Sequence, residues 1–147
     1  MRDSGCKVCP FGGEKIRIYV THCTKKKDDR LKDTGEKVTP DSLYRGKFIE
    51  AVMRTCKQRG VEWAILSDSY GVWFRDVKHE WYEKDPDTVT DSEFWGLVRD
   101  FDERLEAYDE IWFYHNPGRF HPLYGRLLTE TRLTDRVTLF SRVAEIV

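Results

Sequence analysis

Apolar positions follow two patterns along this chain, short continuous runs and longer stretches with a helical period. Apolar runs of strand length lie at 16–21, 62–67, 110–114 and 136–140. Between them, residues 42–59 carry one apolar face before Gly60, and similar amphipathic patterns begin at Thr90 and Pro122. Such runs predict β-strands and such periodic segments predict helices. Thr90 and Glu93 have the spacing of a capping box, which makes their helix the most strongly indicated element.

Strands that alternate with helices predict an α/β fold of the Rossmann-like kind. Right-handed crossovers return successive strands in one direction, so we expect a three-layer domain with a mostly parallel β-sheet flanked by helices. Residues 15–147 form this single domain in our interpretation, and residues 1–14 form a flexible, cysteine-containing segment. The polar segment 22–41 is expected to be a functional or disordered loop.

The connection over residues 68–89 is dense in aromatic side chains. It includes Trp73, Trp81 and Tyr82, and a short strand is possible at 72–74. We expect these aromatics to pack as a lid over the sheet edge, where they either stack on a nucleobase or serve as core.

Composition limits the classes of partner. With 25 Lys and Arg against 26 Asp and Glu, the net charge of -1 gives no global attraction to nucleic acid or to an anionic membrane. Any basic surface must therefore be local. No apolar segment approaches membrane-spanning length and the first residues lack a secretory signal, so we expect a cytoplasmic protein that makes no membrane contact.

Candidate ligand-binding residues lie where the predicted parallel strands end, because open α/β sheets bind ligands at their carboxyl edge. They are His22, Cys23, Thr24, Lys25, Lys26, Ser67, Tyr70, Gly71, Tyr82 and Asn116. The lysines suit a phosphate, although a lysine run is also typical of solvated surface. Ser67 and Gly71 suit either ligand contact or a purely structural turn.

Two residues are candidates for proton transfer at the same edge, His115 and Asp68. The alternative for His115 is a structural hydrogen-bonding role at the end of its strand.

The cysteines suggest a metal site near the N-terminus. Cys6 and Cys9 have the spacing of a zinc knuckle, and Cys23 is a candidate third ligand for zinc or an iron–sulfur centre. Cys23 could equally be a nucleophile or an inert buried thiol, and Cys56 lies on an apolar helical face, as a core residue would.

Four features together resemble a known family. They are the cysteine and lysine cluster at 21–27, the pair Leu43-Tyr44, the turn Leu66-Ser67-x-x-Tyr70-Gly71, and Tyr82 downstream. This pattern resembles the YaaA-like group of small α/β domains related to the YaaA peroxide-stress proteins. The resemblance implies an α/β domain whose cleft serves nucleic-acid or nucleobase-related work. Asp68 departs from the group, in which a small residue followed by a basic one is more usual.

Three functional hypotheses follow. The first is an enzyme that acts on a nucleotide, nucleobase or nucleic-acid end by N-glycosidic or hydrolytic chemistry. The second is a module that binds nucleic acid or a metabolite without turnover, with a structural metal or a redox-sensing cysteine segment. The third is a partner-binding subunit that uses its aromatic lid. A deep cleft with a perturbed His115 or Asp68 would favour the first, and a positive surface without a buried acid–base pair would favour the second.

Overall fold

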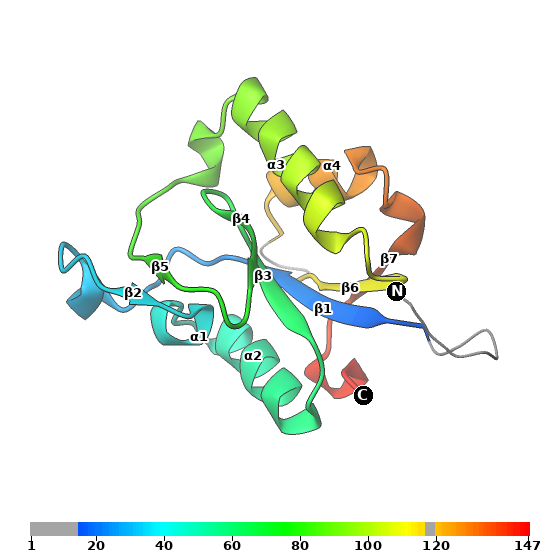
Figure 1. The fold of residues 1–147 in the computed structure, drawn as a ribbon, viewed down its shortest axis with the longest axis horizontal. Coiled ribbons are helices and arrows are strands. Elements are labelled where there is room, and N and C mark those ends of the chain that lie inside the picture. The colour runs from blue at the N-terminus through cyan, green and yellow to red at the C-terminus, as the bar shows by residue number, and fades with distance from the viewer. Residues whose placement is uncertain (1–14, 117–119) are drawn as a thin grey trace.

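A five-stranded sheet forms the centre of the protein, and a computed structural model describes residues 15–116 and 120–147 of it (Figure 1). The strand order is β4-β3-β1-β6-β7. The strands are β1 (Arg17–His22), β3 (Trp63–Ser67), β4 (Gly71–Phe74), β6 (Glu110–Tyr114) and β7 (Val137–Phe140). All neighbours are parallel except the β3–β4 pair, which is an antiparallel hairpin. The predicted α/β fold with a mostly parallel sheet is therefore confirmed.

Helices cover both faces of this sheet. Figure 1 shows α2 (Lys47–Arg59) on one side and α3 (Asp91–Leu105) with α4 (Pro122–Glu130) on the other. Helix α2 connects β1 to β3, α3 leads back across β1 to β6, and α4 connects β6 to β7. Strand β1 thus lies between two crossovers that leave the sheet toward opposite faces. None of the helices in the described ranges is long and apolar enough to span a membrane.

The sequence explains where the two long helices begin and end. The Thr90 side chain accepts the N–H of Glu93, and the Glu93 carboxylate accepts the N–H of Thr90, so the predicted capping box starts α3. Helix α2 ends at Gly60, whose φ of 68° is left-handed and favours glycine.

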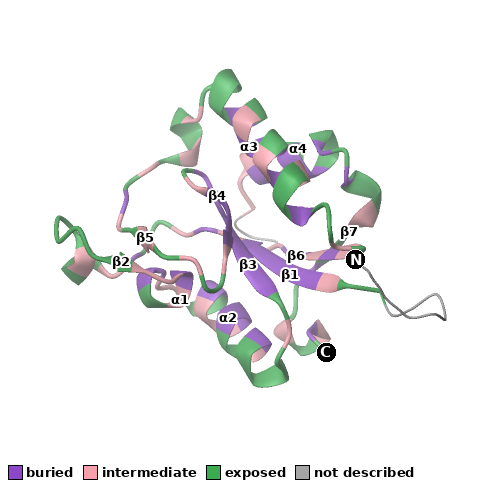
Figure 2. Cartoon of the chain, in the orientation of Figure 1, coloured by how far each residue is buried: buried purple, intermediate pink, exposed green. Residues whose placement is uncertain are grey.

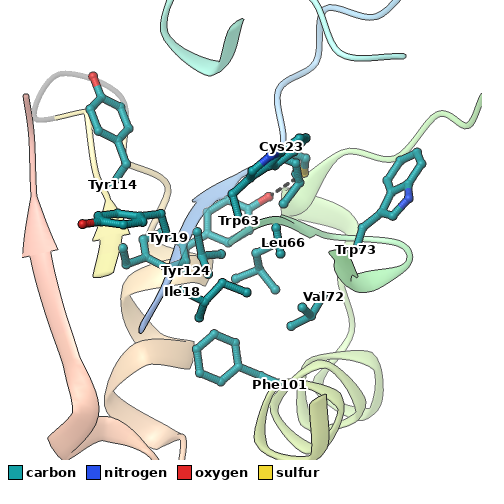
Figure 3. Close-up of a cluster of buried hydrophobic side chains, with 14 of the residues drawn as sticks. Ile18, Tyr19, Cys23, Trp63, Leu66, Val72, Trp73, Phe101, Tyr114 and Tyr124 are labelled. Atoms are coloured by element: carbon teal, nitrogen blue, oxygen red, sulfur yellow. Dashed lines mark hydrogen bonds between the residues drawn. The ribbon is translucent and has the colours of Figure 1, made fainter. Parts of the chain in front are cut away.

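The core lies between the sheet and both helix layers. All five residues of β3 are buried, because both faces of a parallel sheet are covered (Figure 2). Figure 3 shows Phe101 of α3 and Tyr124 of α4 facing Ile18 and Leu66 of the central strands.

The segment expected to be a long loop contains structure of its own. It holds a 3-10 turn at Asp29–Leu31, strand β2 (Lys37–Val38) and helix α1 (Pro40–Leu43). Strand β2 pairs antiparallel with β5 (His79–Glu80). The single helix predicted over 42–59 is instead two helices, separated at residues 44–46.

Of the two roles expected for the aromatics of 68–89, the structure shows the core role for two of them. Trp73 is fully buried in β4 and Tyr82 is 9% exposed, so both belong to the core, while Trp81 is half-buried. Burial of these large apolar faces stabilises the domain more than an exposed lid would.

Candidate functional site

A pocket of about 380 Å³ lies where the chain leaves β1 and β6 for opposite faces of the sheet. It is lined by Thr21, His22, Thr24, Lys25, Lys26, Arg45, Gly46, Lys47, Phe48, Ile49, Tyr114 and Asn116. We call it the basic pocket, because all four of its charged lining residues are cationic. Its position is the topological switch point of the sheet, where open α/β folds bind ligands.

Backbone pairing brings the cations of this pocket together from two segments. The chain after β1 runs antiparallel to the short segment between α1 and α2. A bridge joins Lys27 to Tyr44, and the Arg45 N–H donates to the Lys26 carbonyl at 2.9 Å. The Thr24 hydroxyl lies 3.1 Å from the Lys26 carbonyl and 3.2 Å from the Arg45 carbonyl. Lys25 and Lys26 are thereby held beside Lys47, the first residue of α2.

The three lysines of the basic pocket are exposed, and their ammonium groups form no hydrogen bond with any residue in the described ranges. Arg45 is different, because its guanidinium donates to the Asp41 carbonyl at 3.1 Å and the Tyr44 carbonyl at 3.0 Å. The lysines are therefore the cations available to a ligand.

The first turn of α2 forms one wall of the basic pocket. Gly46 precedes it with a φ of 146°, a backbone conformation that favours glycine, and carries no side chain that could occupy the pocket. The positive end of a helix dipole and its first N–H groups attract anions. Glu50 accepts the N–H of Gly46 at 3.0 Å and weakens this field, so the lysines supply most of the attraction.

His22 contributes a neutral imidazole to the basic pocket. Burial lowers its pKa, and Nδ1 donates to the Cys23 carbonyl at 2.9 Å, which leaves Nε2 as an acceptor. The ring stacks on Tyr124 with centroids 4.8 Å apart and planes 14° apart. The imidazole is thus fixed in orientation and suits recognition of an N–H or O–H group.

Cys23 and Asp68 meet in a buried contact between the ends of β1 and β3. The Cys23 sulfur lies 3.5 Å from Asp68 Oδ1 and 3.2 Å from the Tyr124 hydroxyl, as Figure 3 shows for the tyrosine. Burial, and secondarily the Asp68 charge, raise the pKa of the Cys23 thiol to about 11. Burial also raises the pKa of Asp68. Cys23 is therefore a protonated thiol near neutral pH, which does not favour a nucleophilic role.

Lys27 is separated from its two neighbours in the lysine run. It is only 9% exposed, its ammonium lies 4.5 Å from the centre of the Tyr82 ring, and it donates to the Lys25 carbonyl at 3.3 Å. Burial lowers its pKa.

Ser67 organises the turn between β3 and β4. Its hydroxyl accepts the N–H groups of Ser69 at 3.1 Å and Tyr70 at 2.9 Å, and lies 3.0 Å from the Tyr82 hydroxyl. The Tyr82 hydroxyl is in turn 2.6 Å from that of Tyr44. Ser67 is fully buried, so these contacts belong to the interior of the protein.

A second pocket, of about 330 Å³, lies between this turn and α3. It is lined by Asp68, Ser69, Tyr70, Gly71, Lys84, Glu93, Gly96, Leu97 and Asp100. We call it the acidic pocket, because three of its four charged lining residues are carboxylates.

The structure thus divides the candidate residues among three places. His22, Thr24, Lys25, Lys26 and Asn116 line the basic pocket, Asp68, Tyr70 and Gly71 line the acidic pocket, and Cys23, Ser67 and Tyr82 are buried. His115 packs against Phe120, with ring centroids 5.1 Å apart. Its Nδ1 is buried without a hydrogen-bond partner among the described residues.

Among the residues of the basic pocket that sequence reasoning did not select are Arg45, Lys47 and Phe48. They were assigned to the interior of a continuous helix. The signal that could have placed them is Gly46, since glycine so often breaks or caps a helix.

The predicted metal site falls largely outside the described ranges. Cys6 and Cys9 lie there, as does the whole segment expected to be flexible. Within residues 15–116 and 120–147, no group of three or more His, Cys, Asp or Glu side chains could hold a metal ion.

Comparisons of the chain with protein-family models, with curated proteins and with solved structures found no match. The functional argument therefore rests on the two pockets.

Proposed function

We propose that this protein binds a nucleotide or a nucleic-acid end through the phosphate group, in the basic pocket. One observation carries the proposal: the pocket at the switch point contains four cationic side chains and no carboxylate in its lining. In a chain with a net charge of -1, such a concentration of positive charge is a local feature that a phosphate would exploit.

The remaining lining supports a nucleotide over a bare anion. Phe48 is 47% exposed beside Lys47 and offers a flat face on which a base can stack. His22 and Asn116 add polar groups that can contact a base or a sugar. The volume of about 380 Å³ lies within the range of small-ligand sites. The resemblance to the YaaA-like group implies the same class of ligand.

The site supports binding more strongly than turnover. Asp68 lines the acidic pocket and His115 is absent from the residues that line the basic pocket, so neither proposed proton-transfer group shares a wall with the lysines. The buried thiol of Cys23, with a pKa of about 11, is a poor nucleophile near neutral pH. The binding module is accordingly our first choice among the three hypotheses, and the enzyme is the second.

Calorimetric titration tests the proposal with four probes: a nucleoside 5′-monophosphate, the same nucleoside, inorganic phosphate and a 5′-phosphorylated single-stranded oligonucleotide. The test variant is Lys25→Ala with Lys26→Ala. The matched control is Lys37→Ala with Lys78→Ala, which removes the same charge from exposed positions outside the pocket.

We expect the monophosphate to bind the wild type more tightly than the nucleoside does. The test variant should lose about tenfold in affinity, or about 1.4 kcal/mol, while the control stays close to wild type. For the oligonucleotide, the dependence of affinity on salt should also decrease by about one unit of slope for each lost phosphate contact. Equal affinities of the test and control variants would refute the phosphate site.

Phe48→Ala separates base stacking from phosphate binding. This substitution should weaken binding of the monophosphate by about 1 kcal/mol or more and leave the affinity for inorganic phosphate unchanged. An equal effect on both probes would contradict a stacking role.

A further inference from the structure

Two hydroxyl groups lie at the buried end of the basic pocket. Thr21 is 3% exposed and Tyr114 is 4% exposed, whereas the three lysines of the pocket are exposed. We call Thr21 and Tyr114 the floor of the basic pocket. They are partners in the pairing of β1 with β6, so their side chains leave the sheet side by side on the same face.

Neither floor hydroxyl has a partner in the part of the chain that the structure describes. Each lines the pocket without a hydrogen bond to another described residue, and neither is among the fully enclosed unpartnered atoms, so each reaches open space. Figure 3 shows the Tyr114 hydroxyl directed away from the core cluster. Burial raises the pKa of Tyr114, so this hydroxyl keeps its proton near neutral pH and remains a donor.

The wall beside the floor offers backbone donors. Helix α2 has 13 residues and no side-chain cap, and the N–H groups of Lys47, Phe48 and Ile49 donate to no residue of the described ranges. The same three residues line the basic pocket. Such first-turn N–H groups point out of the N-terminal end of a helix and need acceptors. The floor and the wall thus supply donors from three separate elements, namely β1, β6 and α2.

We propose that the basic pocket selects a phosphomonoester, a terminal phosphate whose oxygens accept hydrogen bonds from the Thr21 and Tyr114 hydroxyls and from the first turn of α2. This selectivity depends on the phosphate binding proposed above and names the class of phosphate. The exposed lysines surround the same group from the solvent side.

The donors explain why a monoester fits better than a diester. A terminal phosphate has three strong acceptor oxygens, and hydrogen bonds to a charged acceptor are stronger than neutral ones. In a diester, a second ester group replaces one of these oxygens. A site built from buried hydrogen-bonding groups rejects a ligand that leaves one of them unpaired.

Calorimetry tests this selectivity with a nucleoside 5′-monophosphate and with the methyl ester of the same monophosphate, which keeps the base, the sugar and a negative charge. The test variants are Thr21→Val and Tyr114→Phe, which remove one hydroxyl each and change neither the shape nor the charge of the pocket greatly. Thr138→Val and Tyr108→Phe are the matched controls, because both residues lie outside the pocket lining.

We expect the wild type to bind the monoester at least about tenfold more tightly than the methyl ester. Each test variant should weaken the monoester about tenfold and the methyl ester less, while both controls keep the wild-type preference. A preference that came only from the charge of the lysines would survive in the test variants. Unchanged monoester affinity in both test variants, or equal losses for the two esters, would overturn the selectivity.

Two oligonucleotides, one with a 5′-phosphate and one with a 5′-hydroxyl, distinguish a nucleic-acid end from a free nucleotide. Tighter binding of the phosphorylated oligonucleotide than of the monophosphate supports a nucleic-acid end, and the reverse order supports a free nucleotide; both ligands are phosphomonoesters. Equal affinities of the two oligonucleotides would contradict the selectivity. If Lys25→Ala with Lys26→Ala weakens the monophosphate and the floor variants do not, the phosphate site stands and only its selectivity fails. No binding of any phosphate probe would refute both.

Discussion

Gly71 is the position where a single methyl group should cost the most stability for its size. Its φ of 75° lies in the left-handed region, and a Cβ there would overlap the Asp100 carboxylate. That carboxylate accepts the N–H of Val72, which is 2% exposed, at 2.7 Å. Gly71→Ala therefore strains the backbone and also displaces the acceptor of a buried donor.

The two contributions can be estimated separately. A non-glycine residue in the left-handed conformation costs about 1 kcal/mol. Leaving the Val72 N–H without its acceptor costs about 1–3 kcal/mol more. The expected loss of unfolding free energy is about 2–4 kcal/mol, a large part of the stability of an ordinary domain.

Gly60 provides the control, because its φ of 68° is similar and a Cβ there would meet no atom within 4 Å. Gly60→Ala should lose only the conformational contribution, about 1 kcal/mol. Urea unfolding of both variants measures the difference. In an Asp100→Ala background, Gly71→Ala should cost no more than Gly60→Ala does. Equal losses for the two single variants would refute the role of the Asp100 contact.

Two further predictions concern the buried polar groups. Urea unfolding of Tyr82→Phe should show a free energy of unfolding about 1–3 kcal/mol below that of the wild type, because the hydroxyls of Ser67 and Tyr44 would lose their buried partner. Tyr70→Phe should lower it by less, because the hydroxyl of Tyr70 is exposed. Similar losses for the two variants would contradict the buried network. Cys23, with a pKa of about 11, is about 10⁻³ thiolate at pH 8, so iodoacetamide should alkylate it about 10²-fold more slowly than an unperturbed thiol. Because the pKa is raised, the rate of alkylation should increase with pH up to about pH 11. Peptide-resolved mass spectrometry measures this rate for Cys23 alone. A plateau below pH 9 would show that the thiol is not buried as described.

The fold could be predicted where local and tertiary preferences agree. Thr90 and Glu93 form a capping box that is complete within four residues, so the start of α3 depends on nothing distant in the chain. The apolar run of β3 is buried on both faces, which is what a continuous apolar strand requires.

The segment 22–41 could not be predicted in the same way. Its two-residue strand β2 exists only because β5 pairs with it from about forty residues away, and neither strand has an apolar period of its own. The break before α2 likewise depends on the bridge between Lys27 and Tyr44. Such short tertiary pairings leave almost no local signal.

The candidate site was predicted as one crevice, and here the hairpin β3–β4 explains the difference. A parallel strand after Ser67 would have returned the chain through a helix, whereas the tight turn at 67–71 sends it back antiparallel and then on to α3. Asp68 therefore meets α3, while the residues after β1 meet α2. Sequence reasoning located the edge of the sheet and could not foresee this divergence.

That divergence makes the relation between the two pockets testable. If one substrate were held by Lys25 and Lys26 and attacked with the help of Asp68, it would have to extend past the buried contact between Cys23 and Asp68. Substitutions in either pocket would then weaken binding of the same molecule. A phosphate site confined to the basic pocket requires the opposite result, in which Asp68→Asn leaves the affinity for a nucleoside monophosphate unchanged. Independence of this kind would favour the binding module, and coupling would restore the enzyme hypothesis with Asp68 as its proton-transfer group.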